Sequence, residues 1–364
     1  MKKMPKVFLF ACGGTGGHIF PALSVGEELG RRGQARILYI CGKKEIENAI
    51  FGFQNAPEVI SMEVLPYQGL KSLIRPFFWL CLVRSFFQSV KLIRRERPAL
   101  VVGFGGYVSF PVIAAAKCLS VPALIHEQNV LPGKANRVLA PYVDGIAASF
   151  PETPEWLKGK KTRVTGNPIR SIIERDCREE AVRFFGFEPQ KKTLLVLGGS
   201  QGAESINTFF LNSLKVMTSL QKNNLQVLHL CGRMRPEDAE QACREHGVFA
   251  RAFSFFNRMD LAYAAADFCV GRAGATFLAE VKTRSIPVLL VPYPFGDGHQ
   301  RANAKVYQKL IGARVCEQKE LNAEKLAEIL GEMMREISTS SLRPQVGPNA
   351  RIALAEFIEE CSSS

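Results

Sequence analysis

The stretch FLFACGGTGGHIFPAL, from Phe8 to Leu23, decides the fold class of this 364-residue chain. Its apolar start is typical of a buried parallel strand, and the segment from Ile19 to Leu29 has a helical period. Glycines fill the turn between them, at Gly13, Gly14, Gly16 and Gly17. Glycine there lets backbone N–H groups approach a ligand, and the helix N-terminus favours negative charge. The stretch therefore predicts a strand–loop–helix unit whose loop binds an anionic or sugar-bearing ligand.

Two common nucleotide-binding motifs do not match this loop. A dinucleotide site needs G-x-G-x-x-G and an acidic residue near the end of the second strand. Here Ile19 stands at the third glycine position, and the second apolar segment ends in Cys41, Gly42 and Lys43. No G-K-[ST] follows a glycine loop, as a P-loop requires. The sequence therefore disfavours NAD and ATP as ligands.

The same strand–loop–helix theme recurs along the chain. It appears in FLFACGGTGGHIFPAL, LVVGFGGYVSFPVIAAA, LLVLGGSQGAESINTFF and FCVGRAGATFLAEV. Two copies precede residue 150 and two follow residue 190, which predicts two similar doubly wound α/β halves. Ligands of such sheets bind at the carboxyl ends of the strands, so we expect the site in a cleft between the halves.

Composition limits the partners and the compartment. The 47 Lys and Arg residues against 34 Asp and Glu give a net charge of +13, which suits an anionic partner. The ten cysteines are scattered without a C-x-x-C pair, as expected of reduced core residues in a cytosolic protein. The short apolar run after the basic N-terminus leads straight into the glycine loop, so we interpret it as a strand and not as a signal peptide.

Polar residues in the second half fit a nucleotide sugar. Glu280 lies six residues after Gly274, about one and a half helical turns in, where a carboxylate can accept two ribose hydroxyls. The loop GGSQGAESIN offers N–H donors and the Ser200 hydroxyl to a diphosphate. The amides of Gln300 and Asn303 both donate and accept, as sugar hydroxyls require.

Seven motifs in order resemble one known family. They are GGTGGHIFPAL, GFGGYVSFP, HEQNVLPGKANRVLA, TGNPIR, GGSQGAESIN, GRAGATFLAE and HQRANA, spread from about Lys6 to Ala350. This set closely resembles the MurG family, the bacterial peptidoglycan N-acetylglucosaminyltransferases. The resemblance implies GT-B architecture, with two Rossmann-like parallel-sheet domains and the active site in the cleft between them. It also implies inverting transfer of GlcNAc from UDP-GlcNAc to the 4-hydroxyl of the N-acetylmuramoyl sugar of undecaprenyl-linked lipid I, giving lipid II.

The resemblance also assigns domains and donor contacts. It implies an acceptor- and membrane-binding domain at 1–163, a UDP-GlcNAc-binding domain at 164–345, and a C-terminal helix at 346–364 that packs back toward the first domain. Carried over by matching motif, the donor-binding residues are Thr15, Gly16, Gly17, Asn129, Arg170, Ser200, Phe256, Ala275, Thr276, Phe277, Leu278, Ala279, Glu280, Gln300 and Asn303. Among them Glu280 is expected on the ribose, and the backbone of Phe256 on the uracil.

Inversion requires a base for the acceptor hydroxyl and stabilisation of the departing UDP. His18 is the first candidate for the base, because histidine titrates near the working pH, and Glu127 is the second. The chain departs from the family pattern at two positions. Phe110 stands where glycine is common and is expected to affect the acceptor side, whereas Gly271 replaces Ser or Cys and should be mild.

The segment from Lys71 to Pro98 is expected to dock on an anionic membrane. It carries seven Lys or Arg residues against one Glu, and its longest apolar run is seven residues. Since a bilayer span needs roughly twenty, the segment should lie on the surface. The aromatic residues assigned to this contact are Phe77, Phe78, Trp79, Phe86 and Phe87. We therefore expect a peripheral protein on the cytoplasmic face of the bacterial inner membrane.

The expected partners are UDP-GlcNAc, lipid I, an anionic membrane surface and other cell-wall synthesis and division proteins, with no nucleic acid. The sequence requires no cofactor and leaves a divalent ion open. Two kinds of alternative remain at this stage: another GT-B enzyme, either a 2-epimerase or a transferase with a soluble acceptor, and a non-catalytic sugar-nucleotide binding protein. An epimerase needs no lipid-facing surface, and a binding protein would be expected to lose His18 and the HEQN motif.

Overall fold

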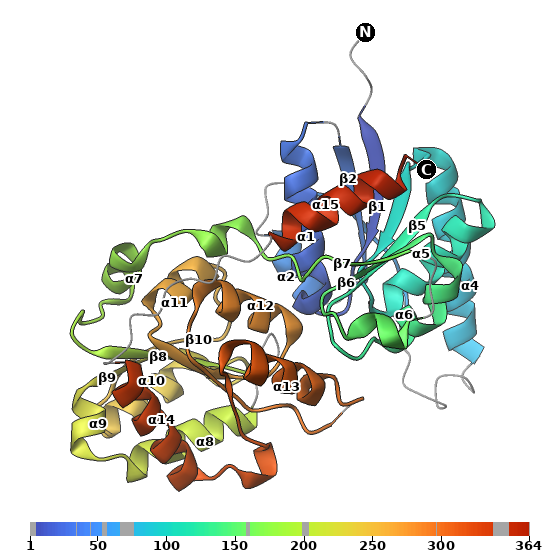
Figure 1. The fold of residues 1–364 in the computed structure, drawn as a ribbon. Helices are drawn as coiled ribbons and strands as arrows, with labels where there is room; N and C mark the ends of the chain where they lie inside the picture. The colour runs from blue at the N-terminus through green and yellow to red at the C-terminus, as the bar shows by residue number, and fades with distance from the viewer. Residues whose placement is uncertain are drawn as a thin grey trace. The chain divides into compact units, whose positions relative to one another are not determined.

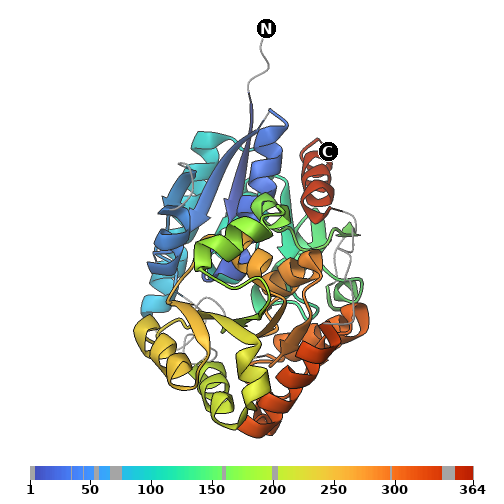
Figure 2. The ribbon, with the colours of Figure 1, turned by 90° about the vertical axis from the view of Figure 1, so that its left-hand side faces the viewer.

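The computed structural model describes residues 5–33, 35–43, 45–52, 57–65, 76–157, 161–198, 204–295, 297–337 and 349–363. The chain divides into two compact units, one of Met1–Arg170 with Pro348–Ser364 and the other of Ser171–Gly347 (Figure 1). Each unit is built on one parallel sheet with helices packed against it (Figures 1 and 2). The predicted pair of doubly wound α/β halves is confirmed.

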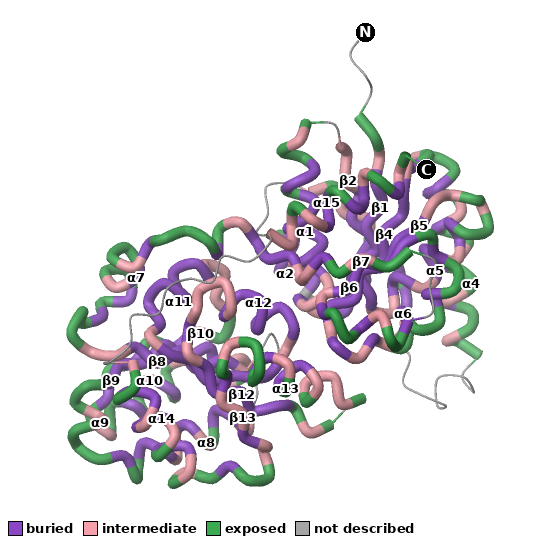
Figure 3. The backbone as a smooth tube through the Cα atoms, viewed as in Figure 1, coloured by how far each residue is buried: buried purple, intermediate pink, exposed green. Residues whose placement is uncertain are grey.

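The described strands of the first unit form a seven-stranded sheet. Its order is β3 (Glu58–Ser61), β2 (Ala35–Cys41), β1 (Lys6–Ala11), β4 (Leu100–Gly103), β5 (Ala123–Glu127), β6 (Gly145–Ala148) and β7 (Thr162–Val164). Alternate side chains of β1 enter two different cores, with Phe8 and Phe10 on one face and Leu9 and Ala11 on the other. The strands in the middle of this sheet are buried (Figure 3), and strands buried on both faces have continuous apolar sequences, as in residues 8–11.

Helices cover both faces of this sheet. They are α1 (Gly16–Arg31), α2 (Glu45–Gly52), α4 (Pro76–Glu96), α5 (Gly106–Cys118), α6 (Lys134–Leu139) and α15 (Ala350–Cys361), with short 3-10 turns η1 (Ala140–Tyr142) and η2 (Thr153–Trp156). The core of Phe8 and Phe10 includes α1 and α15, and that of Leu9 includes α4 and α5. The last helix therefore completes the first unit, where it contacts α1, β5 and β6.

The described strands of the second unit form a six-stranded sheet. Its order is β10 (Phe249–Phe253), β9 (Leu225–Leu230), β8 (Lys192–Leu197), β11 (Phe268–Gly271), β12 (Val288–Leu290) and β13 (Arg314–Val315). The helices are α7 (Arg178–Phe185), α8 (Glu204–Val216), α9 (Ser219–Asn223), α10 (Pro236–Glu245), α11 (Met259–Ala265), α12 (Ala275–Arg284), α13 (His299–Ile311) and α14 (Ala323–Ile337), with η3 (Ser171–Glu174) and η4 (Gln318–Glu320). Helices α8 and α14 pack side by side over one core (Figure 2).

Helix α4 is the longest helix of the described residues. Its 21 residues make it, within the described ranges, the one helix long and apolar enough to cross a bilayer. A helix that packs on a soluble sheet can pass the same test, and α4 does pack: its buried face, from Cys81 through Ser89 to Ile93, lies toward α5 and the Leu9 core. The other face carries exposed aromatic and basic side chains.

Candidate functional site

In each unit the loops at the carboxyl edge of the sheet carry the predicted site residues. In the first unit, Thr15 is the N-cap of α1 and Gly16 and Gly17 are its first residues. The backbone N–H of Gly14 donates to Oε1 of the fully buried Glu47, at 2.5 Å. The hydroxyl of Tyr107 donates to the same oxygen at 3.1 Å. The first glycine loop is thus fixed by a buried carboxylate that the sequence pattern gave no signal for.

The loop after β4 lies tightly against this glycine loop. A Cβ at Gly106 would lie 2.5 Å from the backbone oxygen of Gly13, and one at Gly105 would lie 3.0 Å from Cε1 of His18. Both glycines also have positive φ angles, 91° at Gly105 and 76° at Gly106. Glycine is therefore needed at both positions for the backbone conformation, and also for the close approach of Gly106 to Gly13 and of Gly105 to His18.

The two candidate bases occupy different environments. His18 lies in the first turn of α1, with Nδ1 3.1 Å from Oε1 of Gln128. Glu127, at the end of β5 and buried, accepts four hydrogen bonds. Two come from the backbone and side chain of Asn129, one from the backbone of Gly133 and one from the side chain of Asn136. A carboxylate so occupied anchors the loop after β5, and it would have to lose a donor before it could take a proton.

Arg170 ends the first unit. Its guanidinium carbon lies 4.3 Å from the ring centroid of Phe20 on α1, and the residue is buried. The hydroxyl of Ser24 donates to the backbone oxygen of Ile169. Two contacts from α1 therefore fix the position of the GNPIR segment.

In the second unit, the predicted ribose ligand is buried. Glu280 is only 4% exposed, and its Oε2 accepts a hydrogen bond from the hydroxyl of Tyr263 at 2.7 Å. It is therefore not an ordinary solvated helix glutamate. The segment Ala275–Glu280 forms the first turns of α12, whose N-terminal N–H groups favour an anion. Tyr263 was missed in the sequence because a tyrosine in the apolar run of α11 looks like a core residue.

The predicted sugar contacts lie on α13. Gln300 accepts a hydrogen bond at Oε1 from the backbone N–H of Tyr293, at 2.9 Å. Asn303 is fully buried, and its Nδ2 donates to the backbone oxygen of Ala273, at 3.1 Å. Both amides therefore connect α13 to neighbouring loops at the carboxyl edge.

Arg272 supports the same edge and was also missed. The residue is 7% exposed and follows directly after β11. It donates to the backbone oxygens of Val291 and Pro292, and to Ser205 Oγ and Gln318 Oε1 at 2.8 and 2.7 Å. Burial lowers the pKa of its guanidinium from the usual value. Its partners lie up to 67 residues away in the chain, beyond the reach of any local pattern.

Phe256, expected near the uracil, follows β10 within an aromatic cluster. Its ring centroid lies 4.7 Å from that of Phe253 and 5.5 Å from that of Phe185. These contacts fix the backbone at this position. Ser200, predicted on the diphosphate, lies outside the described residues.

The two departures from the family pattern lie in packed places. Phe110, on α5, packs against the Leu9 core. A Cβ at Gly271 would lie 2.7 Å from the backbone oxygen of Leu197 and 3.1 Å from the ring of Phe277. The Phe277 ring thus fills the space that a Ser or Cys side chain would need.

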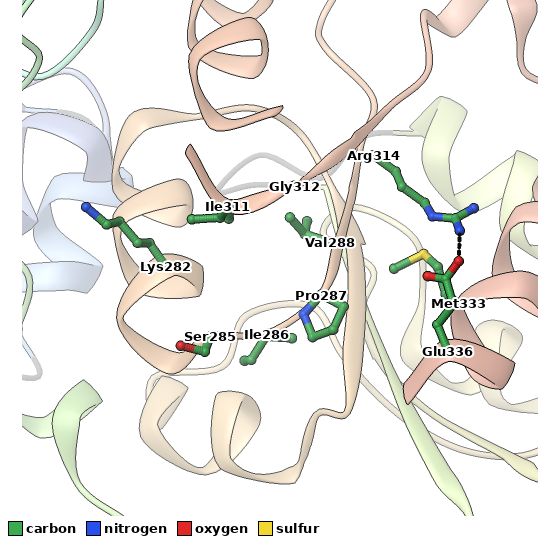
Figure 4. Close-up of a pocket in the computed structure, with 10 residues that line it drawn as sticks. All are labelled: Lys282, Ser285, Ile286, Pro287, Val288, Ile311, Gly312, Arg314, Met333 and Glu336. Atoms are coloured by element: carbon green, nitrogen blue, oxygen red, sulfur yellow. Dashed lines mark hydrogen bonds and ion pairs between the residues drawn. The ribbon is translucent and has the colours of Figure 1, made fainter. Parts of the chain in front are cut away.

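A hollow of about 200 Å³ lies elsewhere in the second unit (Figure 4). It is lined by Lys282 and Ser285 from the end of α12, Val288 from the start of β12, Ile311 from the end of α13, and Met333 from α14. This is the amino edge of the sheet, and no predicted site residue lines it. Among the described residues, no group of three or more His, Cys, Asp and Glu is placed to hold a metal. That the enzyme requires no cofactor stays a prediction from the sequence.

Comparison with known proteins gives consistent matches over both units. The N-terminal domain of glycosyltransferase family 28 matches residues 8–148, and the C-terminal domain of that family matches residues 193–349. A Halothermothrix orenii protein named "UDP-N-acetylglucosamine--N-acetylmuramyl-(pentapeptide) pyrophosphoryl-undecaprenol N-acetylglucosamine transferase" is 38% identical, over 97% of this chain and 98% of its own. A Caldanaerobacter subterraneus protein of the same name is 34% identical, over 91% of this chain and 92% of its own. The crystal structure of Acinetobacter baumannii MurG has a TM-score of 0.72 at 27% identity, over 98% of this chain and 99% of that one.

Proposed function

The chain belongs to glycosyltransferase family 28, and its relatives are named for N-acetylglucosamine transfer in peptidoglycan synthesis. From this membership and the positions of the site residues, we propose how the transfer takes place. The resemblance to the MurG family drawn from the seven motifs is confirmed. The chain is an N-acetylglucosaminyltransferase that moves GlcNAc from UDP-GlcNAc to the lipid intermediate of peptidoglycan synthesis. The non-catalytic alternative has no support from these relatives.

We infer that the transfer inverts the anomeric centre and that the acceptor atom is the 4-hydroxyl oxygen of the muramoyl sugar of lipid I. The stereochemistry and the acceptor atom are those that the seven shared motifs imply, and relatives named for this transfer support them. The observation in the structure that supports a ligand site is the position of the predicted residues at the carboxyl edges of both sheets, where doubly wound folds bind ligands. Glu280, Gln300 and the Phe256 backbone follow strands of the second unit, whereas His18 follows the first strand of the first unit.

In this mechanism His18 takes the proton of the acceptor hydroxyl, the oxygen attacks the anomeric carbon, and the bond to UDP breaks on the opposite side. The N-terminal N–H groups of α12 are suited to the charge that develops on the departing diphosphate. Glu127 is less suited to the base role, because its oxygens already accept four hydrogen bonds.

One assay tests this proposal. Purified protein is incubated with labelled UDP-GlcNAc and a short-chain lipid I analogue, and the products are separated and analysed by NMR. We expect equal amounts of UDP and a disaccharide lipid, with the new linkage inverted relative to the donor and attached at the 4-hydroxyl. A retained configuration, a different attachment site, or free sugar as the main product would contradict the proposal.

We further propose that the enzyme binds the membrane peripherally through the outer face of α4. Phe77, Trp79 and Phe87 are 59%, 48% and 64% exposed. The same helix carries exposed basic residues at Arg84 and Lys91, and each basic residue near anionic lipid contributes about 1 kcal/mol. The basic residues Lys71 and Arg75 lie outside the described residues, and contact with other cell-wall proteins remains a proposal without a named surface.

The aromatic set divides on the helix. Phe86 packs against the Leu9 core, so its predicted place on the lipid-facing surface is corrected, and Phe78 is only partly exposed. The helical period separates Phe86 from Phe87, because adjacent residues lie about 100° apart.

Vesicle sedimentation tests the α4 proposal. The test variant changes Phe77, Trp79 and Phe87 to Ser, and the matched control changes the exposed Phe184, Phe249 and Phe255 of the second unit to Ser. We expect the test variant alone to lose binding to vesicles that contain anionic lipid. Equal binding by wild type and both variants at low salt, or no binding by any of them, would contradict it.

A further inference from the structure

We propose that Gln128, with His126 behind it, is a positioning residue that fixes the tautomer of His18: Nδ1 carries the proton, so Nε2 carries the lone pair that accepts the acceptor proton. This inference rests on the proposed function in one respect, the role of His18 as the base. The assignment of protons itself follows from hydrogen-bond chemistry within the first unit.

His126 lies on β5. The residue is fully buried, and burial lowers its pKa to about 4, so its ring is neutral at working pH. Its Nε2 lies 3.1 Å from the backbone oxygen of Gly166. Since a carbonyl oxygen only accepts, Nε2 of His126 carries the hydrogen. Nδ1 of the same neutral ring must then be an acceptor.

The next step is the side-chain amide of Gln128, which is 2% exposed. One end of this amide lies 2.8 Å from the backbone oxygen of Phe104 and 3.0 Å from Nδ1 of His126. Both of those atoms are acceptors, so this end is the NH2 group. The two neighbours thus fix the amide orientation, which would otherwise be ambiguous.

The last step reaches His18. The oxygen end of the Gln128 amide lies 3.1 Å from Nδ1 of His18. An amide oxygen only accepts, so Nδ1 of His18 donates and carries the hydrogen. In the neutral ring, Nε2 therefore holds the lone pair. The two backbone carbonyls of Gly166 and Phe104 therefore determine which ring nitrogen carries the hydrogen in both histidines.

This arrangement has a chemical consequence for the transfer. When Nε2 of His18 takes a proton, the Nδ1–H to Gln128 hydrogen bond is kept, so no group needs to reorient during the step. Gln128 is a neutral amide, in contrast to the carboxylate that orients histidine in hydrolase triads. It can therefore select the tautomer without adding a negative charge beside an anionic donor.

NMR tests the tautomer directly. The chain has five histidines, and the ring nitrogen signals of His18 in 15N-labelled protein are assigned by their loss in a His18→Gln variant. In the wild type at neutral pH we expect His18 to be protonated at Nδ1 and unprotonated at Nε2. Protonation at Nε2 alone would overturn the proposal, whatever the enzyme's activity.

A variant pair separates positioning from general stability. Gln128→Leu removes the amide next to His18, and the control Gln226→Leu removes an equally buried amide of the second unit, one that bonds Glu188 and Thr193. We expect Gln128→Leu to mix or reverse the His18 tautomers and to lower kcat on the order of 10-fold or more, with the donor KM little changed. The control should lose stability but keep the tautomer and kcat.

An unchanged tautomer or an unchanged kcat in Gln128→Leu would overturn the positioning role, and if that variant does not fold, the wild-type spectrum still decides. The proposed function fails in a different way. If wild-type enzyme forms no disaccharide lipid, or His18→Gln keeps full kcat, the base assignment is wrong, even where the spectrum shows the expected tautomer.

Discussion

The carboxyl edges of the two sheets are built from different chemistry. In the first unit, neutral groups bond one another in a row: an imidazole, an amide and a second imidazole, with one backbone carbonyl accepting from the amide and another from the second imidazole. The buried carboxylates there, Glu47 and Glu127, are occupied by backbone N–H groups and side-chain donors. In the second unit, Arg272 is buried without an ion pair to any carboxylate of the described residues, and Glu280 is held by a phenol.

The difference indicates a division of labour. A path of neutral hydrogen-bonding groups can fix where a proton goes without a change in local charge. A buried guanidinium with only neutral partners keeps a full positive charge close to the edge, which favours an anionic ligand such as a diphosphate. The first edge is therefore suited to proton transfer and the second to holding a charged nucleotide.

The largest expected effect comes from the first edge. His18→Gln should lower kcat by about 10²- to 10⁴-fold, the usual contribution of a positioned base, with little change in donor KM. Steady-state kinetics with both substrates measures this. The control is His229→Gln, which changes a fully buried histidine of the second unit that bonds Asn207. If His18→Gln keeps most of its kcat while Glu127→Gln loses orders of magnitude, the order of the two bases is wrong.

The next effect belongs to the second edge. Glu280→Ala should lower kcat/KM for the donor, with a loss of transition-state stabilisation of about 1.5–3 kcal/mol, because a charged partner of the ribose hydroxyls is lost. The loss should appear mainly in donor KM, and thermal unfolding should show that the variant is folded. Glu240→Ala is a matched control, since Glu240 accepts from the backbone N–H of Ala252 in the same unit. Unchanged donor kinetics would remove Glu280 from the ribose site.

The sequence predicted the fold well because strands, turns and helices depend on residues that are close together in the chain. Apolar runs of buried strands, glycine turns and helical periods need only neighbouring residues to be recognised. The helical period could also have shown that Phe86 and Phe87 face different ways, since the buried face of α4 passes through Cys81, Ser85 and Ser89.

The partners of the site residues were not predictable in this way. His18 meets Gln128 across 110 residues of chain, and Arg272 meets Gln318 across 46. Glu127 illustrates the limit well: its place at a strand end suggested a base, but only the folded loop shows that Asn129 and Gly133 already occupy its oxygens. The end of a predicted strand places a side chain at the edge of the sheet. Its hydrogen-bond partners depend on the folded loops, which have no periodic sequence pattern from which they could be predicted.

Arg272 tests whether charge distinguishes the second edge. Arg272→Met should lower kcat/KM for the donor roughly 10-fold or more, since a buried charged donor is lost and its acceptors are left unpaired. Arg272→Lys keeps the charge but loses the forked geometry, and it should recover part of the affinity for UDP. Arg251→Met is the control, because Arg251 also bonds a carbonyl and lies over a phenylalanine ring in this unit. Equal losses in Lys and Met variants would show that geometry, and not charge, matters at this position.

The smallest expected effect, at Tyr263, decides whether Glu280 is positioned or merely present. Tyr263 is 2% exposed, and its hydroxyl donates to Oε2 of Glu280 at 2.7 Å. Tyr263→Phe keeps the ring and removes only this hydroxyl, so the expected cost is about 1 kcal/mol, or roughly 5-fold in donor kcat/KM, with kcat unchanged. The double variant with Glu280→Ala is the sharper measurement, because a hydroxyl that acts only through Glu280 has no effect once that carboxylate is gone. Isothermal titration with UDP-GlcNAc gives the four affinities of this cycle. If Tyr263→Phe weakens binding by the same factor with and without Glu280, the hydroxyl acts independently of the carboxylate. Tyr263 would then not be what positions Glu280 at the second edge.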